Sequence, residues 1–162
     1  MLFRSTSGRG LIAATRNCPP HDWLTGTGGA IGYAMPVSIG AAVACPDRKV
    51  LCLEGDGSGM YTNQALWTMA REGLDVVVVI FANKTYEILK GEYKNVRAGE
   101  LGKRALSMLE IGNPAIDWLA LAKAQGVDAV RVAELDGFAR ELGAAMKRRG
   151  PKVIEVAMGA QS

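Results

Sequence analysis

The run from Val76 to Ala82, VVVVIFA, constrains the fold more than any other feature of this sequence. It is rich in β-branched residues, which favour strands, and it does not alternate with polar residues. A strand that is apolar at every position has both faces buried, which is typical of a parallel sheet with helices on each side. The chain is therefore predicted to be an α/β protein, a three-layer αβα fold with a mostly parallel sheet.

Other elements follow from shorter patterns along the chain. Further strands are expected at residues 50–53, 129–132 and 152–157. Helices are expected where apolar residues recur at helical spacing, at residues 34–45, 61–72, 117–125 and 137–149. Residues 90–113 mix glycine, charge and one short apolar stretch, so they are expected to form a mobile excursion over one end of the sheet. The 162 residues suit a single domain spanning 1–162.

Composition excludes several classes of function. The net charge of +3 is small, and the cluster at residues 147–149 suits a helix end, so no nucleic-acid partner is expected. No apolar run reaches the roughly 18 residues of a membrane span. Cys18, Cys45 and Cys52 form no C-x-x-C pair, which favours a reducing cytoplasm over disulfides or a zinc site. The single histidine, His21, lies in a proline-rich stretch and is interpreted as a loop residue.

A glycine-rich segment, Glu54-Gly55-Asp56-Gly57-Ser58-Gly59, follows one expected strand and precedes an expected helix. In a parallel sheet this is the carboxyl end of a strand, where open α/β folds bind ligands. Glycines permit close approach of the backbone, and a helix start offers N–H groups to an anion such as phosphate. The Asp56 carboxylate would repel a bare phosphate, so the segment favours phosphate accompanied by a divalent cation.

Asn83 ends the next expected strand and would lie at the same end of the sheet as Asp56. Carboxylate, amide and carbonyl oxygens are ligands that Mg²⁺ accepts. Taken singly, Asp-Gly is an ordinary turn and Asn83 an ordinary strand-end residue. Their conjunction on successive strands, beside Ser58, favours a cation site.

A nicotinamide-binding Rossmann domain is an alternative for a glycine-rich strand-to-helix turn. It requires G-x-G-x-x-G, with an acidic residue about 20 positions later. Gly55, Gly57 and Gly59 alternate, but no glycine follows at the required offset. The Asp56 carboxylate would also repel an unmetallated pyrophosphate, so this alternative is disfavoured.

The segments around these motifs resemble a known family. Gly55-Asp56-Gly57 followed by Asn83 is similar in order and spacing to the signature of thiamin-diphosphate enzymes. The likeness extends to residues 28–36, 46–48 and 64–72. Nearly the whole chain resembles the C-terminal, diphosphate-binding domain of the acetohydroxyacid synthase and benzoylformate decarboxylase group. This resemblance implies thiamin diphosphate and Mg²⁺ as cofactors.

The resemblance also implies roles for individual residues. Asp56 and Asn83 would supply side-chain oxygens to Mg²⁺, and Thr85 a backbone carbonyl. Ile31 matches the apolar residue that props the cofactor in its bent shape, and the Gly29 carbonyl would hold the aminopyrimidine amino group. The residues implied to bind the cofactor are Gly29, Ile31, Gly57, Ser58, Thr85, Tyr86, Thr6 and Ser7.

Family enzymes use an activating glutamate from a separate pyrimidine-binding domain, and the cofactor then serves as an electron sink for 2-oxo acids. This chain is expected to lack that domain, because the resemblance to the cofactor domain begins where the chain begins. Glu54, Glu72 and Glu87 stand at positions that the family does not use for activation. One hypothesis is a subunit of a 2-oxo acid decarboxylase or carboligase, forming a homo- or hetero-oligomer with a pyrimidine-binding domain. The other is a truncated or orphan module that binds thiamin diphosphate and Mg²⁺ without activity of its own.

The resemblance leaves the substrate open, since family selectivity comes largely from the pyrimidine-binding side and from the region after Asn83. Tyr86, Ile88 and Leu89 are the local candidates for contact with a 2-oxo acid. An apolar helix face would explain Ile88 and Leu89 equally well.

Overall fold

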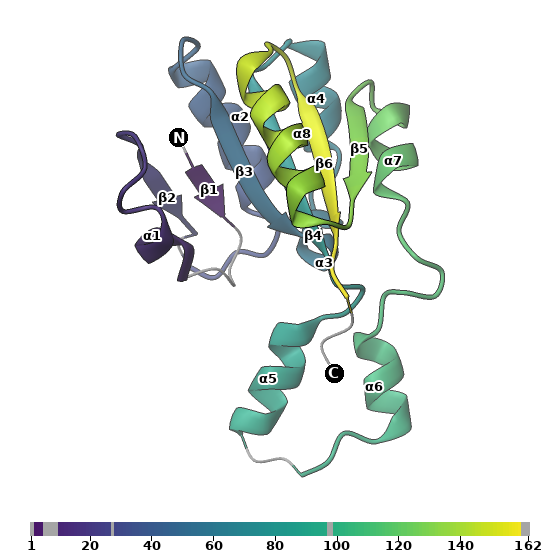
Figure 1. Cartoon of the computed structure of the whole chain (residues 1–162). Helices are drawn as coiled ribbons and strands as arrows, with labels where there is room; N and C mark the ends of the chain where they lie inside the picture. Colours follow the sequence, from purple (N-terminus) through teal and green to yellow (C-terminus); the bar gives the residue numbers. More distant parts are fainter. Residues whose placement is uncertain (1, 5–9, 27, 97–98, 160–162) are drawn as a thin grey trace.

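The computed structural model describes residues 2–4, 10–26, 28–96 and 99–159. Parallel strands and helices alternate through most of this length, as Figure 1 shows. A membrane-spanning helix is absent from the described part of the chain. The elements, in chain order, are β1 (Leu2–Arg4), α1 (Gly10–Ala14), β2 (Trp23–Thr25), α2 (Ala34–Ala44), β3 (Val50–Gly55), α3 (Asp56–Gly59), α4 (Ala65–Arg71), β4 (Val76–Ala82), α5 (Glu87–Asn95), α6 (Lys103–Leu109), α7 (Trp118–Ala124), β5 (Asp128–Val132), α8 (Leu135–Lys147) and β6 (Lys152–Ala157).

The six strands form one sheet in the order β2-β1-β3-β4-β6-β5, and every neighbouring pair is parallel. The prediction of a mostly parallel sheet is therefore confirmed. β3 and β4 are central and aligned in register, with Val50 beside Val76 and Gly55 beside Phe81. Because all strands run the same way, their carboxyl ends meet at one edge, and this edge carries the predicted site.

The run at β4 is buried on both faces, as its sequence predicts. Val76, Val78 and Ile80 belong to a core shared with α2, α4 and α7, and each is fully buried. Val77 and Val79 belong to a second core on the opposite face, covered by α8. Helices on both faces of the sheet make the three-layer αβα fold (Figure 1).

Most predicted elements are confirmed, with shifts at their ends. β4 and β6 have the predicted bounds, and α7 lies within residues 117–125, where the Asp117 carboxylate caps the helix by accepting from Leu119 N and Ala120 N. The helix expected at 61–72 begins only at Ala65, because turns occupy residues 60–64. The helix expected at 137–149 runs instead over 135–147. The short elements β1, α1 and β2 were not predicted.

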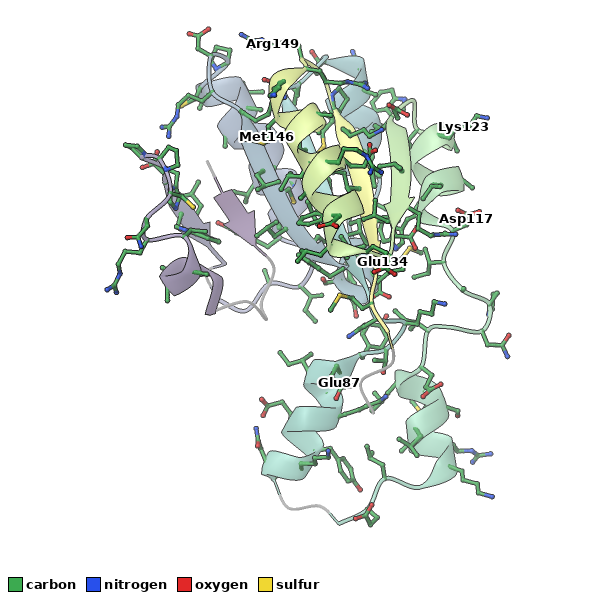
Figure 2. The ribbon with its side chains drawn as sticks, viewed as in Figure 1. Glu87, Asp117, Lys123, Glu134, Met146 and Arg149 are labelled. Carbon is green, nitrogen blue, oxygen red and sulfur yellow. The ribbon has the colours of Figure 1, made fainter. Side chains whose placement is uncertain are left out.

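The excursion expected at residues 90–113 does leave the sheet at one end, but it is largely helical, which was not predicted. This part of the chain contains most of α5 and all of α6, which project as an arm beyond the carboxyl ends of the strands in Figure 1. Neither helix has a buried residue. Figure 2 shows Glu87 at the start of this arm and Arg149 at the opposite end of the molecule. The arm therefore extends from the same end of the sheet as the predicted site.

Candidate functional site

The turn from β3 into α3 presents a carboxylate at the carboxyl edge of the sheet. Gly55 ends the strand with extended backbone, and Asp56 starts the short helix. Gly57 lies under the Tyr86 ring, so that a Cβ atom on Gly57 would be 2.5 Å from Tyr86 Cε1. A side chain at position 57 would therefore require the Tyr86 ring to move. The same contact places Tyr86 directly against the glycine-rich turn.

Asp56 is held in place by backbone groups. Its side chain is buried, with the residue only 4% exposed. Oδ1 accepts a hydrogen bond from Gly57 N at 2.9 Å, and Oδ2 accepts one from Lys84 N at 2.7 Å. Burial raises the pKa of the Asp56 carboxyl above its usual value, while these backbone N–H groups and the charge of Lys84 oppose the rise. Among the described residues, no side-chain cation forms an ion pair with it.

Asn83 follows β4 and lies at the same edge. The bond from Lys84 N to Asp56 joins the two loops directly, because Lys84 is the next residue after Asn83. Asn83 is half-buried, and its Oδ1 accepts from Thr85 N at 3.1 Å. An amide oxygen has two lone pairs, so this bond leaves acceptor capacity at Asn83. Sequence reasoning placed Asp56 and Asn83 at one edge, and the structure brings their two loops into contact.

The oxygens at this edge fit Mg²⁺ better than a softer metal. The described residues contain no group of three or more His, Cys, Asp or Glu side chains that could hold a metal ion by themselves. Mg²⁺ accepts such a sparse donor set, since it takes one or two carboxylates and completes its octahedron with phosphate oxygens and water. A buried carboxylate that lacks a cation partner also has a lower free energy when a metal ion neutralises it. The residues therefore fit a phosphate-bound Mg²⁺ ion.

Ser58 is directed toward a buried glutamate. Its Oγ donates to Glu54 Oε1 at 2.5 Å, and Gly55 N also donates to that oxygen at 3.2 Å. Glu54 is 1% exposed. The predicted strand stopped at Leu53 and left this residue out of the sheet. Its place in β3, two residues after the buried Cys52, is the signal that could have put it on the buried face.

Glu54 also affects its strand neighbour. Burial raises the pKa of the Cys52 thiol, and the nearby charge of Glu54 raises it further. A thiol with a raised pKa is inert, so Cys52 is a core residue and not a nucleophile. All three cysteines of the chain are free.

The turn that carries Gly29 and Ile31 packs against the site. Gly29 has a φ of +67°, and Gly32 has a φ of +76°. Gly32 is so close to the site that a Cβ atom there would lie 3.0 Å from the Ser58 carbonyl oxygen, and Thr62 Oγ1 donates to the Gly32 carbonyl at 2.7 Å. Ile31 is 51% exposed, so it is not a core residue. An apolar side chain thus stands at the surface beside the glycine-rich turn.

Other predicted residues have less structural support. Thr6 and Ser7 lie outside the described residues. Ile88 and Leu89 are 47% and 48% exposed on the arm, so burial in this chain does not explain their apolar character. His21 is a loop residue as interpreted, with its ring nitrogens 2.7 Å from the Pro19 carbonyl oxygen and 3.2 Å from Thr15 Oγ1.

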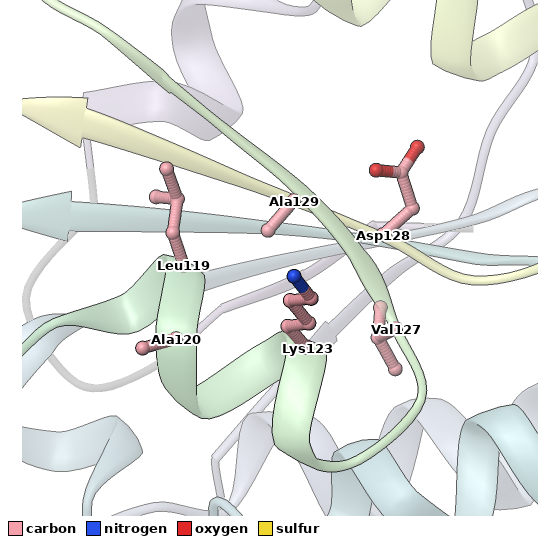
Figure 3. A pocket seen from close by; sticks show the side chains of 6 residues that line it. All are labelled: Leu119, Ala120, Lys123, Val127, Asp128 and Ala129. Atoms are coloured by element: carbon pink, nitrogen blue, oxygen red, sulfur yellow. The ribbon is translucent and has the colours of Figure 1, made fainter.

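A cavity of about 450 Å³ lies away from this edge, between α7 and β5 (Figure 3). Its lining contains none of the predicted site residues, and most of it is apolar. The lining residues are Leu119, Ala120, Lys123, Val127, Asp128 and Ala129. Lys123 and Asp128 are its charged members, and Asp128 already pairs with Arg148 and Lys152. The candidate site is therefore defined by the loops at the carboxyl edge and not by this cavity.

Comparison with known proteins identifies relatives across nearly the whole chain. The matching family model is that of the thiamine pyrophosphate enzyme, C-terminal TPP binding domain, and it matches residues 8–156. The Mycobacterium tuberculosis protein named "Putative acetolactate synthase large subunit IlvX" is 51% identical over 153 residues, which cover 94% of this chain and 30% of that protein. Benzoylformate decarboxylase of Pseudomonas aeruginosa is 31% identical over 137 residues, covering 85% and 25%.

Solved structures agree with these relatives. The thiamine diphosphate-dependent 4-hydroxybenzoylformate decarboxylase of Rhodococcus jostii RHA1 matches with a TM-score of 0.76 and 34% sequence identity. The match covers 86% of this chain and 25% of that chain. The chain thus spans about a quarter to a third of the length of these relatives.

Proposed function

Because this chain belongs to the thiamine pyrophosphate enzymes, as their C-terminal TPP-binding domain, we propose that it binds thiamin diphosphate (TPP) through a Mg²⁺ ion at the carboxyl edge of its sheet. The observation that carries the proposal is the Asp56 carboxylate, which is 4% exposed and oriented by backbone N–H groups from two loops. A divalent cation bound to diphosphate would give this carboxylate a direct cation partner, which it lacks among the described residues.

Three residues of the proposed site would hold the metal. Asp56 and Asn83 supply side-chain oxygens, and Thr85 supplies its backbone carbonyl. The Thr85 side chain is already fixed, because its Oγ1 donates to the Leu109 carbonyl at 3.1 Å. Ser58 would donate to the diphosphate only if its hydroxyl turned away from Glu54 Oε1, to which it donates in this structure.

The rest of the cofactor would lie along the turn at residues 28–32. The Gly29 carbonyl would accept from the aminopyrimidine, and the exposed Ile31 side chain would support the bent cofactor. Tyr86 covers Gly57 on the other side of the site. When bound, thiamin diphosphate supplies the electron sink for decarboxylation or carboligation of a 2-oxo acid. The residues of this chain bind and orient that cofactor.

Calorimetric titration with thiamin diphosphate, in the presence and absence of Mg²⁺, tests the proposal. Wild type should bind only with Mg²⁺, and Asp56→Ala should weaken binding by more than about 100-fold. Asp47→Ala is the matched control, because Asp47 is exposed in the turn before β3 and its removal should leave binding unchanged. Equal affinity of wild type and Asp56→Ala for thiamin diphosphate would refute the metal site.

A partner with a pyrimidine-binding domain is the second part of the proposal. The arm formed by α5 and α6 supports it, since neither helix buries a residue against this chain. Leu89, Val96 and Met108 on this arm are 48%, 70% and 73% exposed. A second chain that covers the arm would remove this apolar surface from water. Light scattering should therefore detect self-association, and a monomer that persists at high concentration would count against it.

Activity of the chain alone decides between an enzyme and a binding module. We propose that the complete site acts on a 2-oxo acid. This chain is a single cofactor-binding domain, so it needs its partner for turnover. The alternative is a module that binds cofactor and has no activity of its own. Turnover of pyruvate or benzoylformate by the purified chain would exclude the module. Turnover that appears only after a pyrimidine-domain chain is added would support the split enzyme.

A further inference from the structure

Lys84 has a backbone conformation that its side chain does not favour. Its φ is +60°, and every other described residue with a positive φ is a glycine. The left-handed region brings Cβ close to the following carbonyl oxygen, so residues with a side chain adopt it only where the surroundings hold them there. Lys84 is itself exposed, so core packing of the side chain does not impose this conformation.

The two backbone groups of Lys84 make contacts in opposite directions. The N–H donates at 2.7 Å to Oδ2 of Asp56, the proposed metal ligand. The carbonyl accepts from Ile111 N at 2.9 Å, in the segment where the chain returns from the arm. One residue therefore joins Asp56 to a segment more than fifty positions later in the sequence.

The return segment, residues 109–112, is built to hold this part of the backbone. Thr85 and Glu110 form an antiparallel bridge, and Tyr86 N donates to the Leu109 carbonyl at 2.8 Å. Gly112 approaches so closely that a Cβ atom there would lie 3.3 Å from Lys84 Cβ. The base of the arm thus clamps the chain on both sides of Lys84.

The clamp determines the orientation of the carboxylate. Gly57 N fixes Oδ1 of Asp56, and Lys84 N fixes Oδ2, so the plane of the carboxylate is set by two loops. Each oxygen keeps lone pairs for a cation. Without the bond from Lys84, rotation about the Asp56 side chain would be restrained from one side only. A fixed ligand loses less conformational entropy when a metal ion binds.

We propose that Lys84 is a positioning residue for the cation site and acts through its backbone. Its left-handed conformation aims the N–H at Asp56, and residues 109–112 maintain that conformation. The inference rests on the proposed function in taking the cation to be Mg²⁺ bound with thiamin diphosphate. It assigns a role in the site to the base of the arm, which contributes no ligand.

A substitution series at position 84 separates backbone from side chain. Lys84→Gly and Lys84→Asn adopt the left-handed region readily, so both should bind Mg²⁺ and thiamin diphosphate as wild type does. Lys84→Val disfavours that region and should weaken binding by about tenfold. If Lys84→Gly loses affinity while Lys84→Arg keeps it, the lysine charge acts on the diphosphate and the proposal is overturned. Equal affinity of Lys84→Val and wild type would also overturn it.

A second pair of variants tests the return segment. Ile111→Pro removes the N–H that bonds to Lys84 and should weaken Mg²⁺-dependent binding, whereas Ile111→Val keeps the N–H and should bind normally. Circular dichroism with thermal unfolding shows whether Ile111→Pro is still folded. If it is folded and binds as wild type does, the return segment has no positioning role.

Hydrogen exchange of the residue 84 amide, measured without metal or cofactor, distinguishes the failure of this inference from the failure of the proposed function. A protected amide in wild type and an exchanging one in Lys84→Val support the inference, even if no thiamin diphosphate binds. Rapid exchange of that amide in wild type would refute the inference, even if Mg²⁺ and thiamin diphosphate bind tightly.

Discussion

Asp75 and Asp128 at the amino end of the sheet are held differently from Asp56 at the carboxyl end. At the amino ends of the strands, Asp75 pairs with Lys49, and Asp128 pairs with Lys152 at 2.9 Å. At the carboxyl ends, Asp56 accepts hydrogen bonds only from backbone N–H groups among the described residues. The hydrogen bond from Lys152 lowers the pKa of Asp128, while burial raises the pKa of Asp56. Asp75 and Asp128 thus have cation partners within the chain, whereas Asp56 forms no ion pair among the described residues.

The presence or absence of a cation partner distinguishes carboxylates that stabilise the fold from a carboxylate that is expected to bind a ligand. An ion pair within the folded chain is present whether or not a ligand is bound. A buried carboxylate without a cation raises the free energy of the folded chain, and a bound metal ion would reverse that effect. The carboxyl end is therefore expected to respond to Mg²⁺ and thiamin diphosphate, and the amino end is expected to be indifferent to them.

The largest expected effect is at the amino end. Lys49 and Asp75 are each only 13% exposed in their side chains, so Asp75→Ala leaves a largely buried ammonium without its carboxylate partner. We expect a loss of about 3 kcal/mol in the free energy of unfolding, measured by urea denaturation. Binding of Mg²⁺ and thiamin diphosphate to the remaining folded protein should be unchanged. A loss of affinity with little loss of stability would break the comparison.

Stabilisation by ligand is the next largest effect and belongs to the carboxyl end. Thiamin diphosphate with Mg²⁺ at 100 times its dissociation constant should raise the free energy of unfolding of wild type by about 2.7 kcal/mol. Asp56→Asn should lose this increment, because the amide cannot neutralise the cation. Asp128→Asn is the matched control at the amino end and should keep it. Thermal unfolding with and without ligand measures all three proteins, and equal shifts in all of them would refute the assignment.

The elements that could be predicted from the sequence are those with a local hydrophobic pattern. β4 and β6 were predicted with their observed bounds, because their patterns are local and continuous. The three-residue strands β1 and β2 are too short to show a period, and they depend on pairing with the sheet. The helices of the arm were missed because α5 and α6 bury nothing, so burial imposes no clear pattern on their sequence.

The candidate site could be predicted only in part. Asp56 and Asn83 follow successive strands, so the parallel topology was enough to place their loops together. The left-handed conformation of Lys84 was not predictable, since contacts made by residues 109–112 hold it. Glu54 was missed because a charged residue normally ends a buried strand, whereas here hydrogen bonds from Ser58 and Gly55 to Oε1 offset part of the cost of burial.

The two ends should also respond oppositely to pH in the metal-free protein. Asp56 has a raised pKa, so its contribution to stability is present below the unfolded pKa of about 3.9 and is lost as the pH rises through its folded pKa. Asp128 has a lowered pKa, so its contribution to stability is present above the unfolded pKa and is lost as the pH falls through its folded pKa. Unfolding curves of Asp56→Asn and Asp128→Asn at several pH values should therefore differ from wild type with opposite slopes. Slopes of the same sign would contradict the comparison.

The smallest expected effect concerns the exposed ion pairs of the amino end. The side chains of Asp128 and Arg148 are 53% and 51% exposed, so solvent screens their attraction. Lys152 is more enclosed, at 11%, but Asp128→Asn keeps an oxygen that can accept from it. We expect Asp128→Asn to lower the free energy of unfolding by about 0.5 kcal/mol at neutral pH, and less in high salt. A loss as large as that of Asp75→Ala, unaffected by salt, would mean that Asp128 acts as a buried structural charge and that exposure does not set the strength of pairing at this end.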